Sequence, residues 1–259
     1  MINSRSVILF SIINGRNIWS HLGWRDLKVR YSATRFGPWW SVANLSVIVL
    51  ASSIAVSLLS GRSTLSSVPK VTLGLMLWTF ISASLIESTR LYEESKGLLL
   101  NTTLDELAVL LRLIWRNWIV LLHNFLVVAV VFALFKREAI FKALIVLPLS
   151  AMIALILIFP MIVISRLVYW KTDLRAVVPA LVQFGFFLTP VLWIAPESGP
   201  GRILLELNPA AWILYVSELL ILGTGSPWGY LLRVSLLFCV SLLLAELVIR
   251  KNGSMKKRL

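Results

Sequence analysis

Residues 24–40, WRDLKVRYSATRFGPWW, join a cationic segment to the first long apolar run of the chain. Apolar side chains recur here at helical spacing beside a cluster of basic ones, and the apolar stripe consists of Trp24, Leu27 and Tyr31. This pattern is typical of a helix in the plane of a membrane, with rings at the acyl boundary and cations against anionic headgroups. Gly37 and Pro38 end that helix, and two tryptophans follow where a spanning helix would begin. We therefore expect this stretch to mark the cytoplasmic side.

Composition places the chain among membrane proteins. Its 259 residues are 58% hydrophobic, with a mean hydropathy of +0.87, which is more apolar surface than one soluble core can bury. The net charge of +13 comes from cations beside apolar runs, so it predicts contact with membrane lipids or an acidic protein partner and no binding of nucleic acid. The single cysteine, Cys239, excludes an internal disulfide and a cysteine-based metal site.

Six apolar segments are long enough to cross a hydrocarbon core of about 30 Å, which takes about 20 helical residues. They are residues 39–60, 68–87, 114–135, 143–165, 176–195 and 229–249. With six transmembrane helices, both termini and most of the 25 lysines and arginines are cytoplasmic. We predict one all-α integral membrane domain over residues 1–259, in which residues 1–38 form amphipathic interface helices with breaks at Gly15 and Gly23. The opening segment lacks a small-residue cleavage site and is expected to be retained.

A seventh apolar segment, residues 203–222, is broken at Asn208 and Pro209 and contains Glu206 and Glu218. An acidic side chain at the bilayer centre costs about 2.5 to 3.5 kcal/mol, so we do not count this segment as a span. It is expected to form an extracytoplasmic helical hairpin between spans 5 and 6. Two placements stay open: a re-entrant hairpin covered by protein or a water-filled cavity, or a helix lying flat on the outer interface.

The connection between the second and third spans, residues 87–106, is rich in acidic residues. Opposite charges recur there at helical spacing, and residues 101–103, Asn-Thr-Thr, are a candidate helix N-cap. One interpretation is a solvated charged face that has no partner. The other is a coupling helix that docks on a second protein.

The sequence lacks the two short motifs that would indicate nucleotide binding or serine-hydrolase catalysis by this chain. No GxxxxGK[ST] phosphate loop and no GxSxG nucleophile elbow occur, and His21 and His123 stand alone. Glu246 is the one acidic residue deep in a predicted span, and its position one turn before Arg250 predicts that it reaches the inner interface. Active transport by this chain would therefore require an energy source in another subunit.

Aromatic residues are common in the predicted spans. We interpret the tryptophans at span ends as interfacial belt residues, namely Trp39, Trp115, Trp170 and Trp228. Trp78, in mid-span, and the run QFGFFLTP from Gln183 fit a belt less well. Ring faces and hydroxyls suit a sugar chain, whose C–H faces stack on aromatic rings. The same residues could instead face lipid or pack in the core.

Short motifs in a fixed order resemble ABC type-2 permeases that export O-antigen, capsule and teichoic-acid polymers. The N-terminal signature matches at Arg25, Asp26, Leu27, Lys28, Arg30, Tyr31, Gly37, Pro38 and Trp40. Further matches are TDLRAVVP, FFLTPVLW and LNPAAWILYVSELLILG, so the resemblance covers residues 24 to about 223. The chain departs from the family pattern at Phe36, Leu45 and Thr172, where leucine, proline and arginine are usual.

This resemblance implies a membrane-spanning permease subunit that exports a lipid-linked cell-surface polysaccharide across a bacterial plasma membrane. Two copies of the chain would form the channel, and two copies of a separate ATP-binding subunit would supply ATP and Mg. No catalytic residue, cofactor or metal is expected in this chain. Alternatives are a permease of the same architecture for drugs or lipids, and a membrane-embedded acyl or glycosyl transferase, for which only Asp173 and His123 could serve.

Three groups of site residues are expected. Contacts with the ATP-binding subunit are predicted at Arg25, Asp26, Lys28, Arg30, Glu87, Arg90, Glu93, Glu94, Asp105 and Glu106. The polymer channel is predicted to involve Trp78, Phe80, Gln183, Phe184, Phe187 and Thr189. The outer gate is predicted at Asn208, Pro209, Trp212 and Tyr215.

Overall fold

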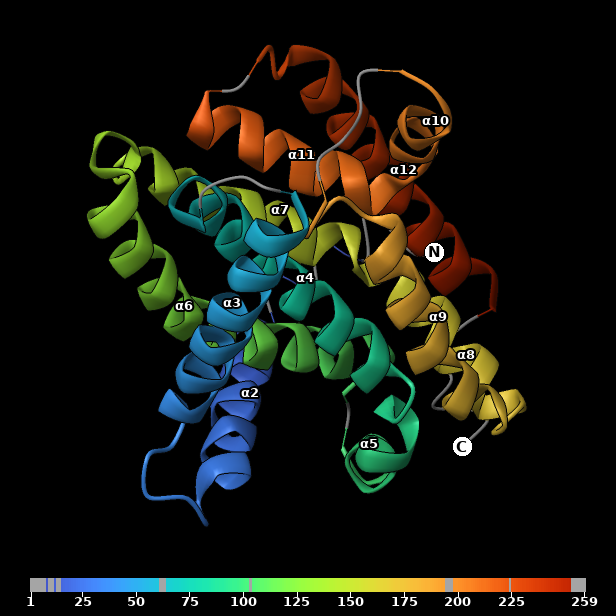
Figure 1. Ribbon diagram of the computed structural model, residues 1–259. Coiled ribbons are helices and arrows are strands. Elements are labelled where there is room, and N and C mark those ends of the chain that lie inside the picture. Colours follow the sequence, from blue (N-terminus) through green and yellow to red (C-terminus); the bar gives the residue numbers. More distant parts are fainter. Residues whose placement is uncertain are drawn as a thin grey trace.

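The computed structural model describes residues 8, 12, 15–60, 64–102, 104–193, 198–223 and 225–252, and within these ranges the regular structure is helical (Figure 1). The elements are α2 (Arg16–Tyr31), α3 (Trp39–Ser60), α4 (Thr64–Ser88), α5 (Leu91–Asn101), α6 (Glu106–Phe135), the short 3₁₀ helices η1 (Arg137–Ala139) and η2 (Lys142–Ile145), α7 (Val146–Ile156), α8 (Ile158–Trp170), α9 (Leu174–Leu188), α10 (Pro200–Leu207), α11 (Pro209–Leu222) and α12 (Trp228–Asn252). The predicted all-α class is confirmed for this part of the chain.

Several of these helices could cross a membrane. In the described ranges, five stretches are long and apolar enough: Trp39–Leu58, Val68–Ser88, Glu106–Phe135, Lys142–Trp170 and Trp228–Lys251. The chain therefore has the multi-pass character that its composition predicts. In the predicted hairpin, α10 and α11 are bent by 97° and could together count as a further span. The fifth predicted span contains α9, which has 15 residues and is shorter than the 20 or so of a full crossing.

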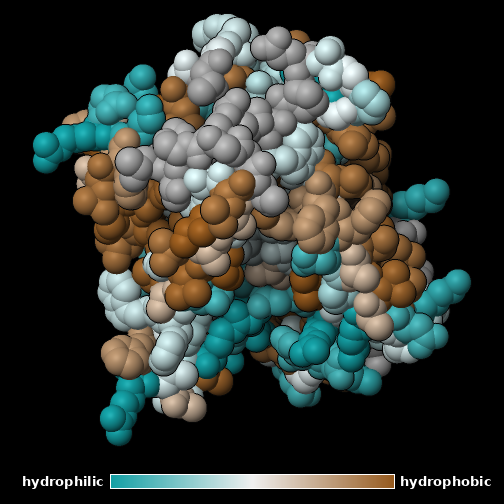
Figure 2. Space-filling view, in the orientation of Figure 1, coloured by the Kyte–Doolittle hydropathy of each residue, from teal (hydrophilic) through white to brown (hydrophobic). Residues whose placement is uncertain are grey.

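The two ends of the helix bundle differ. In Figure 1, α2 and α5 lie at the lower end, which we call the α2 end, and α10 and α11 lie at the upper end. Hydrophobic side chains cover the middle of the face in Figure 2, and hydrophilic ones gather over the α2 end. Large apolar side chains on α3, including Val47, Leu50 and Leu58, are exposed. An apolar band of this extent is expected where a protein contacts lipid or a further subunit.

α4 lies at the centre of the bundle. It contacts α3, α6, α8, α9 and α11, and the Met76 and Leu77 side chains are fully buried. Gly74 lies against the segment that follows α9, where a Cβ atom would be 3.2 Å from Val191 Cγ1. Residues of α4 can therefore reach partners on five other helices.

α2 packs closely on α6, and glycine makes this possible. A Cβ atom at Gly23 would lie 2.8 Å from the carbonyl oxygen of Arg112 and 3.0 Å from Trp115 Cδ1. The predicted break at Gly23 is therefore wrong, because the helix continues through it and uses its small size for a close approach. Gly15 is the residue immediately before α2, so the helix begins where the sequence predicted a break.

The apolar stripe predicted on α2 is divided between two environments. Leu27 is only 3% exposed, while Trp24 is exposed and Tyr31 is partly buried. The expectation that all three face lipid is wrong for Leu27, because the neighbouring α6 covers that side of the helix.

α6 begins eight residues before the predicted third span. Its N-cap is Asp105, whose Oδ1 accepts a hydrogen bond of 2.8 Å from the Ala108 amide. The predicted cap at residues 101–103 is therefore wrong. An aspartate at this position satisfies one of the free amides of the first turn. The fourth predicted span is likewise longer, since it runs from η2 through α7 and α8 to Trp170 with a break at Leu157.

The contact between α2 and α6 can be tested at Gly23. Gly23→Ala is expected to lower the free energy of unfolding by about 1–3 kcal/mol, because backbone or Trp115 must move to admit the methyl group. Gly97→Ala, on the exposed side of α5, is the matched control. A Cβ atom at Gly97 would have no neighbouring atom within 4 Å. The control is expected to gain about 0.5–1 kcal/mol from helix propensity. Equal stability of the two variants during denaturant titration in mixed micelles would contradict the close packing.

Candidate functional site

Three helices meet in a cluster of charges at the α2 end, which we call the junction cluster. Asp26 on α2 accepts a short hydrogen bond from Arg112 Nε and lies 4.0 Å from Arg116. Glu87 at the end of α4 binds Arg116 at 2.7 Å and Arg30 of α2 at 2.5 Å. Arg112 and Arg116 are one turn apart on α6, so both reach Asp26, and Arg116 also reaches Glu87. The cluster therefore ties α2, α4 and α6 together.

A second, more deeply buried ion pair lies between α6 and α8. Arg166 donates two hydrogen bonds to Glu106, from Nε to Oε1 at 3.0 Å and from Nη2 to Oε2 at 2.7 Å. It also donates from Nη1 to the Val248 carbonyl oxygen at 3.2 Å, which brings in α12. Tyr92 on α5 donates a short hydrogen bond to Glu106. Residues of α5, α6, α8 and α12 thus meet around this ion pair, which we call the Glu106 pair.

The environment of Tyr92 keeps its hydroxyl protonated. Burial raises the pKa of Tyr92 well above its ordinary value, and the neighbouring negative charge of Glu106 raises it further. The hydroxyl is therefore a hydrogen-bond donor to Glu106 over the physiological pH range.

The structure brings two predicted cytoplasmic connections into contact. Arg175, at the start of α9, binds Glu93 of α5 at 2.6 Å. A polar cavity of about 300 Å³ lies next to this pair, between α5, α8 and the start of α9. Its wall includes Tyr92, so the cavity adjoins the Glu106 pair. α5 is therefore held from two sides.

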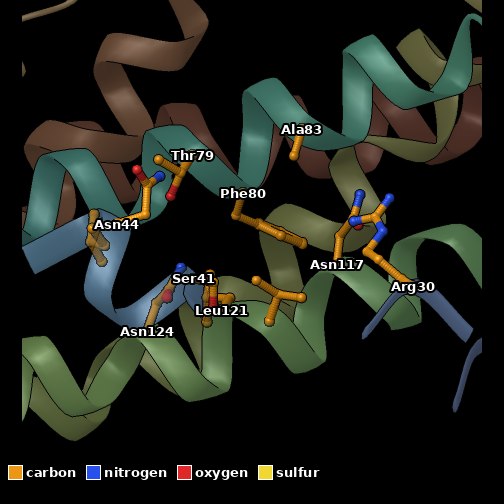
Figure 3. Close-up of a pocket in the computed structure, with 11 residues that line it drawn as sticks. Arg30, Ser41, Asn44, Thr79, Phe80, Ala83, Asn117, Leu121 and Asn124 are labelled. Carbon is orange, nitrogen blue, oxygen red and sulfur yellow. The ribbon is translucent and has the colours of Figure 1, made fainter. Parts of the chain in front are cut away.

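A second polar cavity, of about 160 Å³, lies among α3, α4 and α6 (Figure 3). Three asparagine side chains line it, and we call it the amide pocket; its lining residues are Arg30, Ser41, Asn44, Leu45, Thr79, Phe80, Ala83, Asn117, Val120, Leu121 and Asn124. In Figure 3, Arg30 and Asn117 lie at one end and Asn44, Ser41 and Asn124 at the other, with Phe80 between. Polar groups at this depth of an apolar bundle are typical of functional sites.

The residues predicted to contact an ATP-binding subunit fall into two groups. Exposed at the α2 end are Arg25, Lys28, Arg90, Glu93 and Glu94. Engaged within the chain are Asp26, Arg30 and Glu87 in the junction cluster, Asp105 as the α6 cap, and Glu106 in its buried pair. The first group and the exposed Arg30 present surface to another protein, although Glu93 is also bound to Arg175 and Arg30 to Glu87.

The residues predicted to line a polymer channel are also divided. Trp78 packs against Phe186 with ring centroids 5.7 Å apart. Gln183, Phe184 and Phe187 lie on the exposed side of α9. Phe80 and Thr189 are buried, Phe80 at the amide pocket and Thr189 at the end of α9. The exposed group alone could face a path formed with a second copy of the chain.

The predicted outer gate is a compact turn held by hydrogen bonds. Asn208 caps α11, since its Oδ1 accepts from the Ala210 amide at 3.0 Å, and its Nδ2 donates to Thr189 Oγ1 at 2.9 Å. Pro209 occupies the first position of α11, where its missing N–H costs nothing. Trp212 donates from Nε1 to the Glu206 carbonyl oxygen at 3.0 Å.

Sequence reasoning missed much of the charge pairing. The glutamates of the hairpin are both paired: Glu206 with Arg202 and Arg233, and Glu218 with Lys70 at 3.0 Å. Pairing of this kind lowers the cost of acidic residues at membrane depth. Glu246 is paired as well, since Arg250 Nε donates to its Oε1 at 2.8 Å.

The geometry offers no metal centre in the described ranges, because no three His, Cys, Asp or Glu side chains come together there. His123 Nδ1 lies 2.8 Å from the Ile119 carbonyl oxygen, and its ring packs against Trp39. Asp173 lies at the start of α9. Each therefore has an ordinary structural environment.

The Glu106 pair can be tested by a double-mutant cycle. Glu106→Gln and Arg166→Met are each expected to lower the free energy of unfolding by about 3–5 kcal/mol, because each leaves one buried charge unpaired. The double variant is expected to be more stable than the sum of the two losses predicts. Glu138→Gln is the control, since Glu138 is an exposed partner of Lys136 and its loss should change little. Additive losses in a mixed-micelle denaturant titration would contradict the pair.

Comparison with known proteins leaves the resemblance to polysaccharide permeases a prediction. No protein-family model matches the chain, and none of the curated proteins matches it. Support for a function therefore comes from the contacts, charges and cavities described above.

Proposed function

We propose that this chain is the membrane-spanning subunit of an ABC exporter that moves a lipid-linked cell-surface polysaccharide across a bacterial plasma membrane. ATP and Mg would bind in a separate subunit, of which two copies would serve two copies of this chain. The ordered family motifs from Trp24 to Gly223 suggest this function, and the shape of the α2 end supports it.

The observation that carries the proposal is the construction of α5. This short helix projects from the α2 end in Figure 1 and exposes Glu93 and Glu94. Its opposite side is buried and contributes Tyr92 to the Glu106 pair. A force applied to the exposed side would therefore reach α6, α8 and α12 through buried contacts. A coupling helix for an ATP-driven partner needs this combination of free surface and rigid attachment.

The α2 helix supplies a second docking surface of the opposite charge. Arg25 and Lys28 are exposed on it, while Asp26 and Arg30 attach it to α6 and α4. An ATP-binding subunit with both acidic and basic patches would fit this end. Charge complementarity of this kind chiefly sets partner choice and association rate.

Six crossings with both termini in the cytoplasm are part of the proposal. α9 would be the fifth crossing, shortened because its far end bonds to Asn208 in the hairpin. The α10–α11 hairpin would lie outside, with Glu206 and Glu218 neutralised by basic partners. Polymer would pass between two copies along the exposed α9 surface, where Phe184 and Phe187 offer rings and Gln183 an amide.

The proposed export can be tested in a host strain that lacks this chain. Such a strain is expected to retain lipid-linked polymer inside the cell, and the wild-type chain should restore it to the surface. Glu94→Lys reverses an exposed charge on α5 and is expected to lower both surface polymer and ATP hydrolysis by the co-purified complex about tenfold, which corresponds to about 1.4 kcal/mol. Glu138→Lys, which reverses an exposed charge remote from α5, is the control.

Two results would overturn the proposal. One is ATP hydrolysis by the purified chain without a second subunit. The other is normal surface polymer in the strain that lacks the chain.

The proposed topology predicts where a C-terminal fusion lies. Green fluorescent protein after Leu259 is expected to fluoresce, and alkaline phosphatase at the same position is expected to be inactive, because both would be cytoplasmic. An active phosphatase fusion would show an odd number of crossings and would remove the docking surfaces from the ATP-containing side.

A further inference from the structure

The amide pocket contains a buried acceptor that the fold does not use. Asn124 lies in the middle of α6 and is only 6% exposed. Among the described residues, no donor lies within hydrogen-bonding distance of its Oδ1 atom. A buried polar atom without a partner is destabilising, so a native structure that keeps one at the wall of a cavity points to a bound donor.

The hydroxyl groups around the pocket also offer acceptors. Ser41 donates its proton to the Pro38 carbonyl oxygen at 2.7 Å, and Thr79 donates to the Met76 carbonyl oxygen at 2.8 Å. Each hydroxyl oxygen therefore keeps lone pairs for a donor in the pocket. Asn124 also lines this space, so α3, α4 and α6 each contribute polar side chains to the walls of the pocket (Figure 3).

The charges around the pocket favour a neutral ligand. Arg30 is the only charged residue among those lining it, and its guanidinium is bound to Glu87 at 2.5 Å. An anionic group such as a phosphate would compete with Glu87 for this guanidinium. A metal cation would lie close to the guanidinium and would find no carboxylate in the lining. Hydroxyl groups, which donate to amide and hydroxyl oxygens, satisfy these walls without a charge.

The shape of the pocket suits a single ring. A cavity volume of about 160 Å³ leaves room inside the pocket for a group about the size of one sugar ring. The Phe80 ring lies between the two polar ends in Figure 3. A pyranose could place C–H groups against the part of Phe80 that lines the pocket and direct its hydroxyls to the polar side chains at the end where Asn124 lies.

We propose that the amide pocket binds one neutral hydroxylated sugar ring. The inference deepens the proposed function and rests on it for the biological source of the ring, which would be a sugar next to the lipid carrier of the polymer. The binding itself depends only on the walls of the pocket.

The test uses the full-length chain in phosphatidylcholine nanodiscs, which contain no sugar detergent. The probes are octyl β-glucoside below its micellar concentration, free glucose, and octyl tri(ethylene glycol) as a chain-matched compound without a ring. Thermal unfolding and saturation-transfer NMR report binding. Octyl β-glucoside is expected to raise the Tm and to show saturation transfer, and the glycol ether is not.

Variants at Asn124 connect the binding to this pocket. Asn124→Leu removes the unpartnered acceptor but keeps a side chain of similar size, so it is expected to fold and to bind octyl β-glucoside at least tenfold more weakly. Asn101→Leu, on the exposed end of α5, is the matched control and should bind as the wild type does. Binding of octyl β-glucoside alone would identify a membrane-delivered sugar, and equal binding of glucose would identify a free sugar; either result supports the site.

Other outcomes overturn the inference. They are the same Tm shift with the glycol ether, binding that Asn124→Leu leaves unchanged, or stabilisation by inorganic phosphate that depends on Asn124. These results are separable from those of the export test. Sugar binding without export would remove the proposed function and keep the pocket, and export without Asn124-dependent binding would remove the pocket alone.

Discussion

The requirement that buried charges be paired governs how these helices assemble. Arg166 and Glu106 are almost completely enclosed, and removing either one would leave the other as an unpaired charge in a buried site. Because their partners include Tyr92 and the Val248 carbonyl oxygen, this one pair determines how α5, α6, α8 and α12 meet. Packing of apolar side chains fills the remaining space, but apolar contact alone has little direction, and in lipid it provides little drive for helices to associate.

The pairing of buried charges also connects the proposed docking end with the proposed sugar site. The junction cluster attaches α2 to α4 and α6, and the Glu106 pair attaches α5 to the rest of the bundle. Both lie at the end where an ATP-binding subunit would dock. The amide pocket begins at Arg30, a member of the junction cluster, so the proposed sugar site and the proposed docking end share a residue. Movement at the docking end could therefore reach the sugar site directly through Arg30, without a long series of intervening residues.

Helix class and most helix positions could be predicted, because apolar runs near 20 residues leave few alternatives. α3 and α12 lie within a few residues of the segments expected at 39–60 and 229–249. The start of α6 was missed because Arg112 and Arg116 resemble interfacial residues when their acidic partners are unknown. Gly23 was misread as a break for a related reason: a glycine that ends a helix and one that admits a neighbouring helix look the same in one sequence.

The candidate sites were less predictable, since each is built from separate segments. The local helical pattern accounts for the exposure of Arg25, Lys28, Glu93 and Glu94, and their contact with a second subunit stays a prediction. The burial of Glu106 does not follow, because Arg166 is 60 residues away. The three asparagines of the amide pocket each lie in an apolar run, which signals an unusual polar side chain, yet only the packing of α3, α4 and α6 shows that they share a cavity.

The length and composition of α6 have a mechanical consequence. Its 30 residues span about 45 Å, which exceeds a hydrocarbon core of about 30 Å. In the proposed topology, the turns with Glu106 and Arg112 lie at the cytoplasmic end of this helix. No glycine or proline interrupts the helix, unlike α4 and α9, so it resists bending along its length. α6 would thus act as a stiff lever, and a small tilt imposed at the turns with Glu106 and Arg112 would displace Asn124, in the middle of the helix, without any hinge between them.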